Sequence, residues 1–201
     1  RRLLWTLLLA VAACGEPAVR PEGDAALPPE EAAAQLLAAA EAGDRDAQYA
    51  IAVARATGVG AEPDDAAALR FAKRAADQDL AEAQFLLGVL LQEGRGTAAD
   101  PAGAFRWYLA AAEQGNADAQ FAAAEVLAAG AGVAKNPEEA ARWYRKAAEQ
   151  GDVASQRWLA RAYFEGIGVP RDLAEAAHWR IAAASHGDAG AQGETGVPFL
   201  R

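Results

Sequence analysis

The sequence repeats itself every 36 residues. A glutamine, a Gly-x-Gly pair, a large aromatic residue and an alanine pair all recur with this spacing, without insertions. The glutamines stand at 48, 84, 120, 156 and 192, and the aromatic residues at 71, 107, 143 and 179. A period of roughly 20–50 residues is typical of repeat proteins, in which each unit contacts mainly its neighbours. The length of 201 residues therefore sets the number of units rather than the number of domains.

Capping residues divide each unit into two helices. In the third unit, Asn116 can cap a first helix over residues 117–128, which Gly130 ends. A second helix then begins at Asn136-Pro137, because asparagine accepts bonds from free backbone N–H groups and proline tolerates the first helical position. Alanine-rich composition also favours helix. The sequence therefore predicts an all-α protein built from helix pairs.

Four full units cover residues 44–187. Residues 30–43 predict one more helix, which is the second half of an incomplete leading unit and caps the array. Residues 188–201 begin a fifth unit and then depart from the pattern, so we expect a partial repeat and a tail.

The N-terminus has the features of a bacterial export signal. Two arginines precede an apolar run, so residues 1–13 are predicted to be a signal peptide. The run ends in Val11-Ala12-Ala13-Cys14, which resembles a lipobox and predicts lipidation of Cys14. Residues 14–29 then form a flexible tether. We expect a lipid-anchored protein of the cell envelope, on the outer membrane and facing the periplasm. Secretion without an anchor is the alternative.

Charge and motifs limit the classes of function. The net charge of −9 argues against a nucleic-acid partner, because phosphates require a basic surface. One cysteine and two histidines do not complete a metal set, and no nucleophile or phosphate-binding motif occurs. We therefore predict no catalytic residues, no metal and no cofactor.

The units resemble the Sel-one-like repeat, a relative of the tetratricopeptide repeat. The third unit carries the motif as Ala117-x-Ala119-Gln120, then Gly130-x-Gly132-Val133, and last Trp143-Tyr144-x-Lys146-Ala147-Ala148. The resemblance implies an α/α superhelical solenoid of antiparallel helix pairs, and a scaffold or adaptor that binds proteins. A cysteine-rich branch of the family is linked to β-lactam hydrolysis. That branch has a cysteine pair in each repeat, which this chain lacks.

A binding surface is predicted on the first helices. In the parent family one stripe of these helices lines a concave groove, and here its residues differ from unit to unit. The aromatic residues of this stripe can instead be buried core, which is the alternative. The predicted partner-binding residues are Tyr49, Val53, Phe85, Val89, Phe121, Glu125, Arg157 and Arg161.

The sequence thus predicts a non-enzymatic envelope scaffold that binds a protein or peptide and reaches the membrane through its N-terminal lipid. Two alternatives stay open at this point. One is an envelope enzyme of the β-lactamase or peptidoglycan-processing type, and the other is a secreted, unanchored effector.

Overall fold

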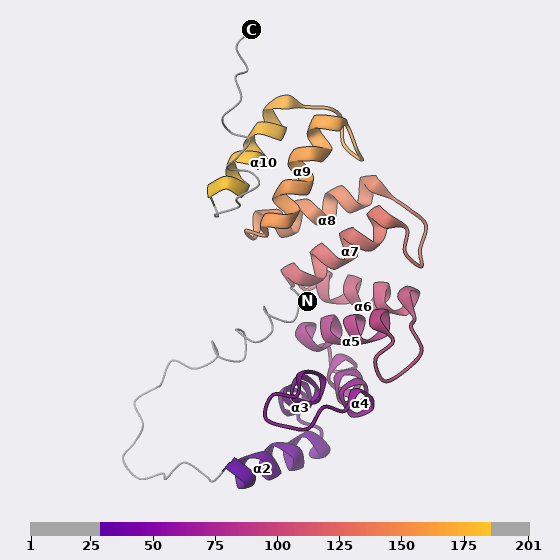
Figure 1. The fold of residues 1–201 in the computed structure, drawn as a ribbon, viewed down its shortest axis with the longest axis vertical. Coiled ribbons are helices and arrows are strands. Elements are labelled where there is room, and N and C mark those ends of the chain that lie inside the picture. Colours follow the sequence, from indigo (N-terminus) through magenta and orange to yellow (C-terminus); the bar gives the residue numbers. More distant parts are fainter. Residues whose placement is uncertain (1–28, 186–201) are drawn as a thin grey trace, which may run out of the picture.

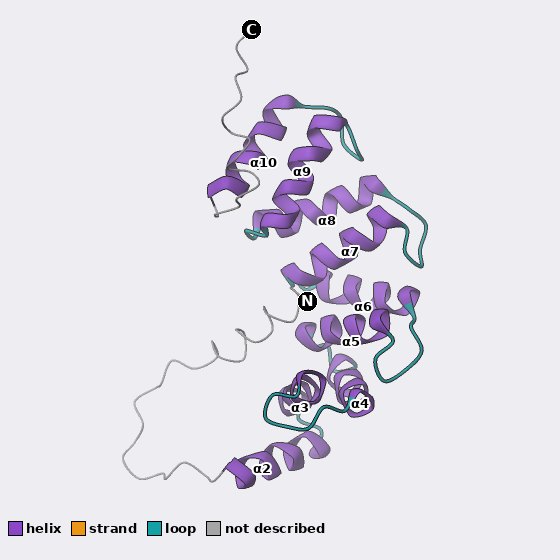
Figure 2. Cartoon of the chain, viewed as in Figure 1, coloured by secondary structure: helices purple, strands orange, loops and turns teal. Residues whose placement is uncertain are grey.

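A computed structural model describes residues 29–185, which form nine α-helices and contain no strand (Figures 1 and 2). The helices are α2 (Pro29–Ala42), α3 (Arg45–Thr57), α4 (Asp65–Ala76), α5 (Ala81–Glu93), α6 (Pro101–Glu113), α7 (Ala117–Ala129), α8 (Pro137–Glu149), α9 (Val153–Glu165) and α10 (Leu173–Ser185). Cys14 and the expected partial fifth repeat lie outside the described residues.

The helices form a solenoid. Each packs against the next helix in the chain, and Figure 1 shows them stacked in order along the long axis, from α2 to α10. The first helices of the four pairs are α3, α5, α7 and α9, and the second helices are α4, α6, α8 and α10. The predicted all-α solenoid of helix pairs is confirmed. The helix expected over residues 30–43 is α2.

The predicted caps set the helix ends. Asn116 accepts a bond from the Ala119 N–H at 2.8 Å, and Asn136 accepts one from Glu139 at 3.1 Å. Gly130 follows α7 with a left-handed φ of +75°. Asp79, which stands where later units have glycine, also takes a left-handed φ of +57°. It is the one non-glycine residue in the described part that does so.

Small and aromatic residues fill the space between the helices. The aromatic side chains of the second helices are buried at Phe71, Trp143 and Trp179, and Trp107 is partly buried against the core cluster that contains Phe71. The alanine pairs are also buried, for example Ala147 at 0% exposure. Their small size allows close approach of the backbones. Both sets recur in the sequence because they pack between the helices of every repeat.

Glutamine side chains connect successive repeats. Gln120 donates to the Ala112 carbonyl at 3.1 Å, and its own Oε1 accepts a bond from Gln150 at 2.8 Å. The same arrangement joins Gln48 to Gln78 and Gln84 to Gln114. Buried polar groups need such partners. In the described part of the chain, the Oε1 atom of Gln156 has none. We call this series the glutamine ladder.

The second glycine of the three later Gly-x-Gly pairs, at 96, 132 and 168, lies against the preceding repeat. A Cβ added to Gly168 would come within 2.1 Å of the Pro137 carbonyl oxygen at the start of α8. The same clash would arise between Gly96 and the Asp65 carbonyl oxygen, at 2.3 Å. Gly60, in the first full repeat, meets nothing within 4 Å.

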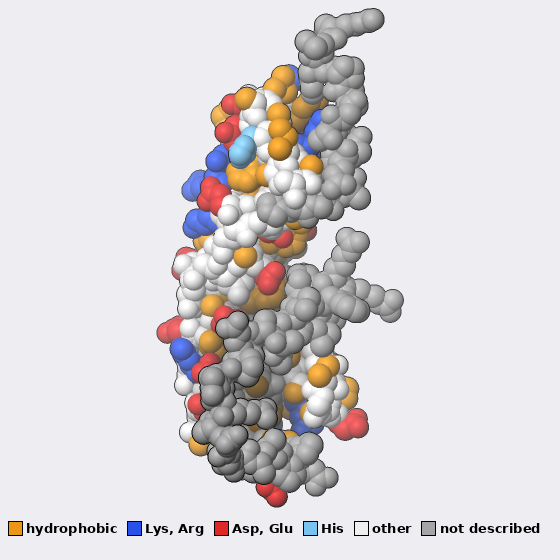
Figure 3. Space-filling view, turned by 90° about the vertical axis from the view of Figure 1, so that its left-hand side faces the viewer, with side chains coloured by type: hydrophobic (Ala, Val, Ile, Leu, Met, Phe, Trp, Pro, Cys, Tyr) orange, Lys and Arg blue, Asp and Glu red, His pale blue; other side chains and the backbone are white. Residues whose placement is uncertain are grey.

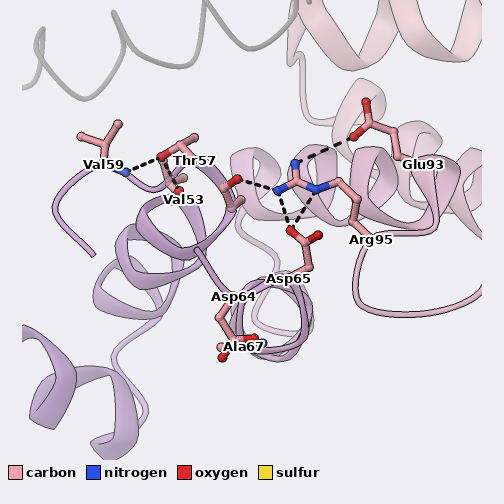
Figure 4. A network of polar contacts seen from close by, with 9 residues as sticks. Val53, Thr57, Val59, Asp64, Asp65, Ala67, Glu93 and Arg95 are labelled. Atoms are coloured by element: carbon pink, nitrogen blue, oxygen red, sulfur yellow. Dashed lines mark hydrogen bonds and ion pairs between the residues drawn. The ribbon is translucent and has the colours of Figure 1, made fainter. Parts of the chain in front are cut away.

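Arg95 adds a polar contact at one of these junctions (Figure 4). Its Nε donates to Asp65 at 2.9 Å, and its guanidinium also reaches the Ala56 carbonyl at the end of α3. The equivalent residues of the later units, Ala131 and Ile167, cannot form this bridge. The first two full repeats are therefore joined more tightly by polar contacts at this loop.

Candidate binding surface

Two of the predicted groove residues belong to the core. Phe85 is 4% exposed and packs on Tyr108, with ring centroids 5.8 Å apart. Val53 is 8% exposed in the cluster that joins the first repeats. A partner cannot reach either side chain. The alternative given for the aromatic residues of this stripe, burial in the core, therefore holds for Phe85.

The other predicted residues retain accessible surface. Tyr49, Val89 and Phe121 are partly buried against the core, whereas Glu125, Arg157 and Arg161 are exposed. Arg161 forms an ion pair with Glu165 at 3.0 Å. Trp158 on α9 is also partly buried and was absent from the prediction. We call this set of accessible first-helix residues the A-face: Tyr49, Val89, Phe121, Glu125, Arg157, Trp158 and Arg161.

An aromatic cluster with one carboxylate stands at the junction of α7, α8 and α9. The Tyr144 ring stacks on Trp158 with a centroid distance of 4.2 Å and meets Phe121 edge-on at 5.9 Å. Tyr144 itself is fully buried. Its hydroxyl donates to Oε1 of Glu125, which is exposed on α7. Partly exposed aromatic and acidic groups thus lie together at the α7–α9 end of the A-face.

Negative charge is concentrated near this cluster. The pKa of the Tyr144 hydroxyl is raised above its ordinary value, chiefly because the group is buried. The hydrogen bond to Glu125 and the negative charges of Glu125 and Asp152 raise it further. Incomplete hydration of its carboxyl group, and then the charge of Asp152, raise the pKa of Asp118 as well. The charges of Glu125 and Asp152 therefore both act on Tyr144, and Asp118 and Asp152 act on each other.

Replacing Asp118 by asparagine is expected to raise the melting temperature at pH 7. A carboxyl whose pKa is higher in the folded than in the unfolded chain stabilises the fold below the unfolded pKa. That contribution is lost as the pH rises through the folded-state pKa. The gain from Asp118→Asn should therefore shrink in melting curves recorded below about pH 4. If the parent protein melted at a higher temperature than the variant at pH 7, the claim that the charge of Asp118 destabilises the fold would be wrong.

Charges of both signs share the visible surface, and Figure 3 shows acidic, basic and apolar side chains interspersed. Within residues 29–185, no group of three or more potential ligands among His, Cys, Asp and Glu is arranged to hold a metal ion. No helix of this range has the length and hydrophobicity that crossing a membrane requires.

Comparisons with known proteins agree with this architecture. A family model described as the Sel1 repeat matches residues 45–80, 81–116, 117–152 and 153–188. No curated protein matches the chain.

Among solved structures, a Sel1 repeat protein from Oxalobacter formigenes is 33% identical with a TM-score of 0.74; the match covers 83% of this chain and 48% of that one. The protective antigen c5321 of uropathogenic Escherichia coli, which has an SLR fold, is also 33% identical with a TM-score of 0.78, covering 81% of this chain and 35% of that one. The chain thus spans less than half of either relative. Cysteine rich protein B of Helicobacter pylori is 19% identical, covers 63% of this chain and 90% of that one, and has a TM-score of 0.50. At this identity the likeness shows the fold alone.

Proposed function

The chain belongs to the Sel1 repeat family, and we propose that it is a non-enzymatic scaffold of the bacterial cell envelope that binds a protein or peptide through the A-face. The observation that carries the proposal is the contrast between buried and accessible positions of the first helices. Buried positions repeat, as Ala47, Ala83 and Ala119 do. The accessible positions at α7 and α9 instead hold aromatic residues, a carboxylate and two arginines.

These residue types suit an interface. Tyrosine, tryptophan and arginine provide most of the binding energy at protein interfaces, because they combine large contact areas with hydrogen bonding or charge. Phe121 and Trp158 offer accessible ring surface next to the exposed Arg157 and Arg161. A peptide lying along α7 and α9 would contact all four.

The proposed location comes from the N-terminal sequence. Arg1 and Arg2, the apolar residues 3–13 and the lipobox-like end at Cys14 together support export and lipid attachment. Fourteen residues, 15–28, separate Cys14 from the helical array. A chain of that length reaches at most about 50 Å. The A-face would therefore act close to the membrane.

Site-specific photo-crosslinking in cells tests the proposed surface. A benzoylphenylalanine placed at Arg161, on the A-face, should give a discrete crosslinked product. The matched control places the same group at Arg106, which is exposed on the second helix α6. A product of equal yield at both positions, or none at Arg161, would count against binding through the A-face.

Fractionation of the same cells tests the anchor. The parent protein should be found with the outer membrane and should incorporate radiolabelled palmitate. The Cys14→Ser variant should lose the label. An unlabelled parent protein in the medium would favour the secreted alternative.

A further inference from the structure

Phe121, Glu125 and Trp158 form a group with the composition of a cation-binding site. Phe121 on α7 and Trp158 on α9 both contact the Tyr144 ring, which is fully buried. Phe121 and Trp158 are themselves only partly buried, and Glu125 on α7 is exposed. We call Phe121, Glu125 and Trp158 the α7–α9 site.

Glu125 gives this site a negative charge. It lies one turn after Phe121 on α7, is exposed, and accepts a hydrogen bond from the hydroxyl of Tyr144. A carboxylate has about four lone-pair sites, so it can accept further bonds from a ligand while it accepts one from tyrosine. The charge of Asp152 also acts on Tyr144 and adds to the negative potential there.

The carboxylate is not required for packing. In the preceding repeat, the equivalent buried tyrosine, Tyr108, donates its hydroxyl to the neutral side chain of Gln92 at 3.0 Å. The positions equivalent to Glu125 in the two preceding units hold Val53 and Val89. Fold maintenance therefore does not account for a charge at this position.

Trp158, like Glu125, differs from the residues at the equivalent positions of the earlier units. Ala50, Leu86 and Ala122 occupy the equivalent positions of the earlier units. Among the described repeats, two partly accessible aromatic residues against one buried tyrosine, together with a carboxylate, occur only in the α7–α9 site.

We propose that the α7–α9 site binds a cationic side chain, arginine or lysine, of the partner. The inference rests on the proposed function. Aromatic ring faces attract cations through the ring quadrupole, and a guanidinium can stack on a ring while it donates to a carboxylate. An anionic group would be repelled by Glu125, and a neutral group would gain neither attraction. The arginines on α9 do not alter this selection, because it depends on direct contact with the rings and with Glu125.

A ligand titration of the full chain, followed by NMR, tests whether the α7–α9 site binds a cation. The probe is N-acetyl-arginine amide, and its neutral isostere N-acetyl-citrulline amide is the control ligand. The indole N–H signal of Trp158, assigned with the Trp158→Phe variant, should shift saturably with the arginine probe. It should not shift with the citrulline probe.

Two variants complete the design. Glu125→Gln should bind the arginine probe about tenfold more weakly. Its fold should persist, because glutamine accepts a tyrosine hydroxyl elsewhere in this chain. Glu149→Gln, which removes an exposed carboxylate from the last turn of α8, should leave the affinity unchanged. Equal shifts with both probes, or an unchanged affinity in Glu125→Gln, would overturn the proposal.

Crosslinking at Arg161 distinguishes failure of the cation site from failure of the proposed function. If the crosslinked product forms but the α7–α9 site does not distinguish arginine from citrulline, partner binding through the A-face is supported and the cation site is refuted. If no crosslinked product forms and the two probes are not distinguished, both proposals are refuted.

Discussion

Replacing Gly168 by alanine is expected to destabilise the fold by about 1–3 kcal/mol more than the same change at Gly60. Both glycines are the second of a Gly-x-Gly and both have a left-handed φ, +68° and +77°. Alanine at either site therefore pays the same backbone strain, about 1–2 kcal/mol. Only at Gly168 would the new methyl group also meet the backbone of the preceding repeat, at the Pro137 carbonyl.

Chemical denaturation of the full chain, followed by circular dichroism, measures the difference between these two variants. Gly60→Ala is the matched control, because it has the same strain and open space around the Cβ position. Equal losses of stability would show that the loop moves aside at no cost, and that the close approach does not hold the repeats together.

The Phe85→Ala variant should lose about 3–5 kcal/mol of stability, because the ring is removed from a fully packed site. Phe85 is 4% exposed, lies against Tyr108 and belongs to a core cluster that is rich in alanine. Phe121→Ala should cost less, because part of that ring already contacts solvent. The two phenylalanines occupy the same position in successive units, so each is a control for the other.

The two variants should also separate stability from binding. Phe121→Ala should reduce the crosslinked yield at Arg161 while it retains the helical signal. Phe85→Ala should act through loss of fold, which denaturation curves reveal. If Phe85→Ala proves no more destabilising than Phe121→Ala, its assignment to the core is incorrect.

The periodicity was sufficient to predict the helix pairs and their caps. These features repeat because each unit meets the same neighbours, so one position has one environment. Asn116 and Asn136 could be assigned as caps because the bonds they make are local, three residues along the chain.

Exposure on the first helices could not be predicted in the same way. Tyr49, Phe85, Phe121 and Arg157 share one repeat position, yet Phe85 is buried and Arg157 is exposed. The difference depends on which side chains the neighbouring repeat supplies. Trp158 was missed for a related reason, since its stack on Tyr144 joins two different repeats. The available signal was a single tryptophan at a position that otherwise holds alanine or leucine.

The glutamine ladder has a consequence for how the array comes apart. Each inner rung couples the opening of one repeat to that of the next, so the central repeats should exchange their amide hydrogens as one cooperative unit. Within residues 29–185, the Oε1 atom of Gln156 accepts no bond like those that Gln78, Gln114 and Gln150 donate in the other units. Unzipping should therefore start at α9 and α10, and it would take Trp158 on α9 away from Phe121 and Glu125 on α7.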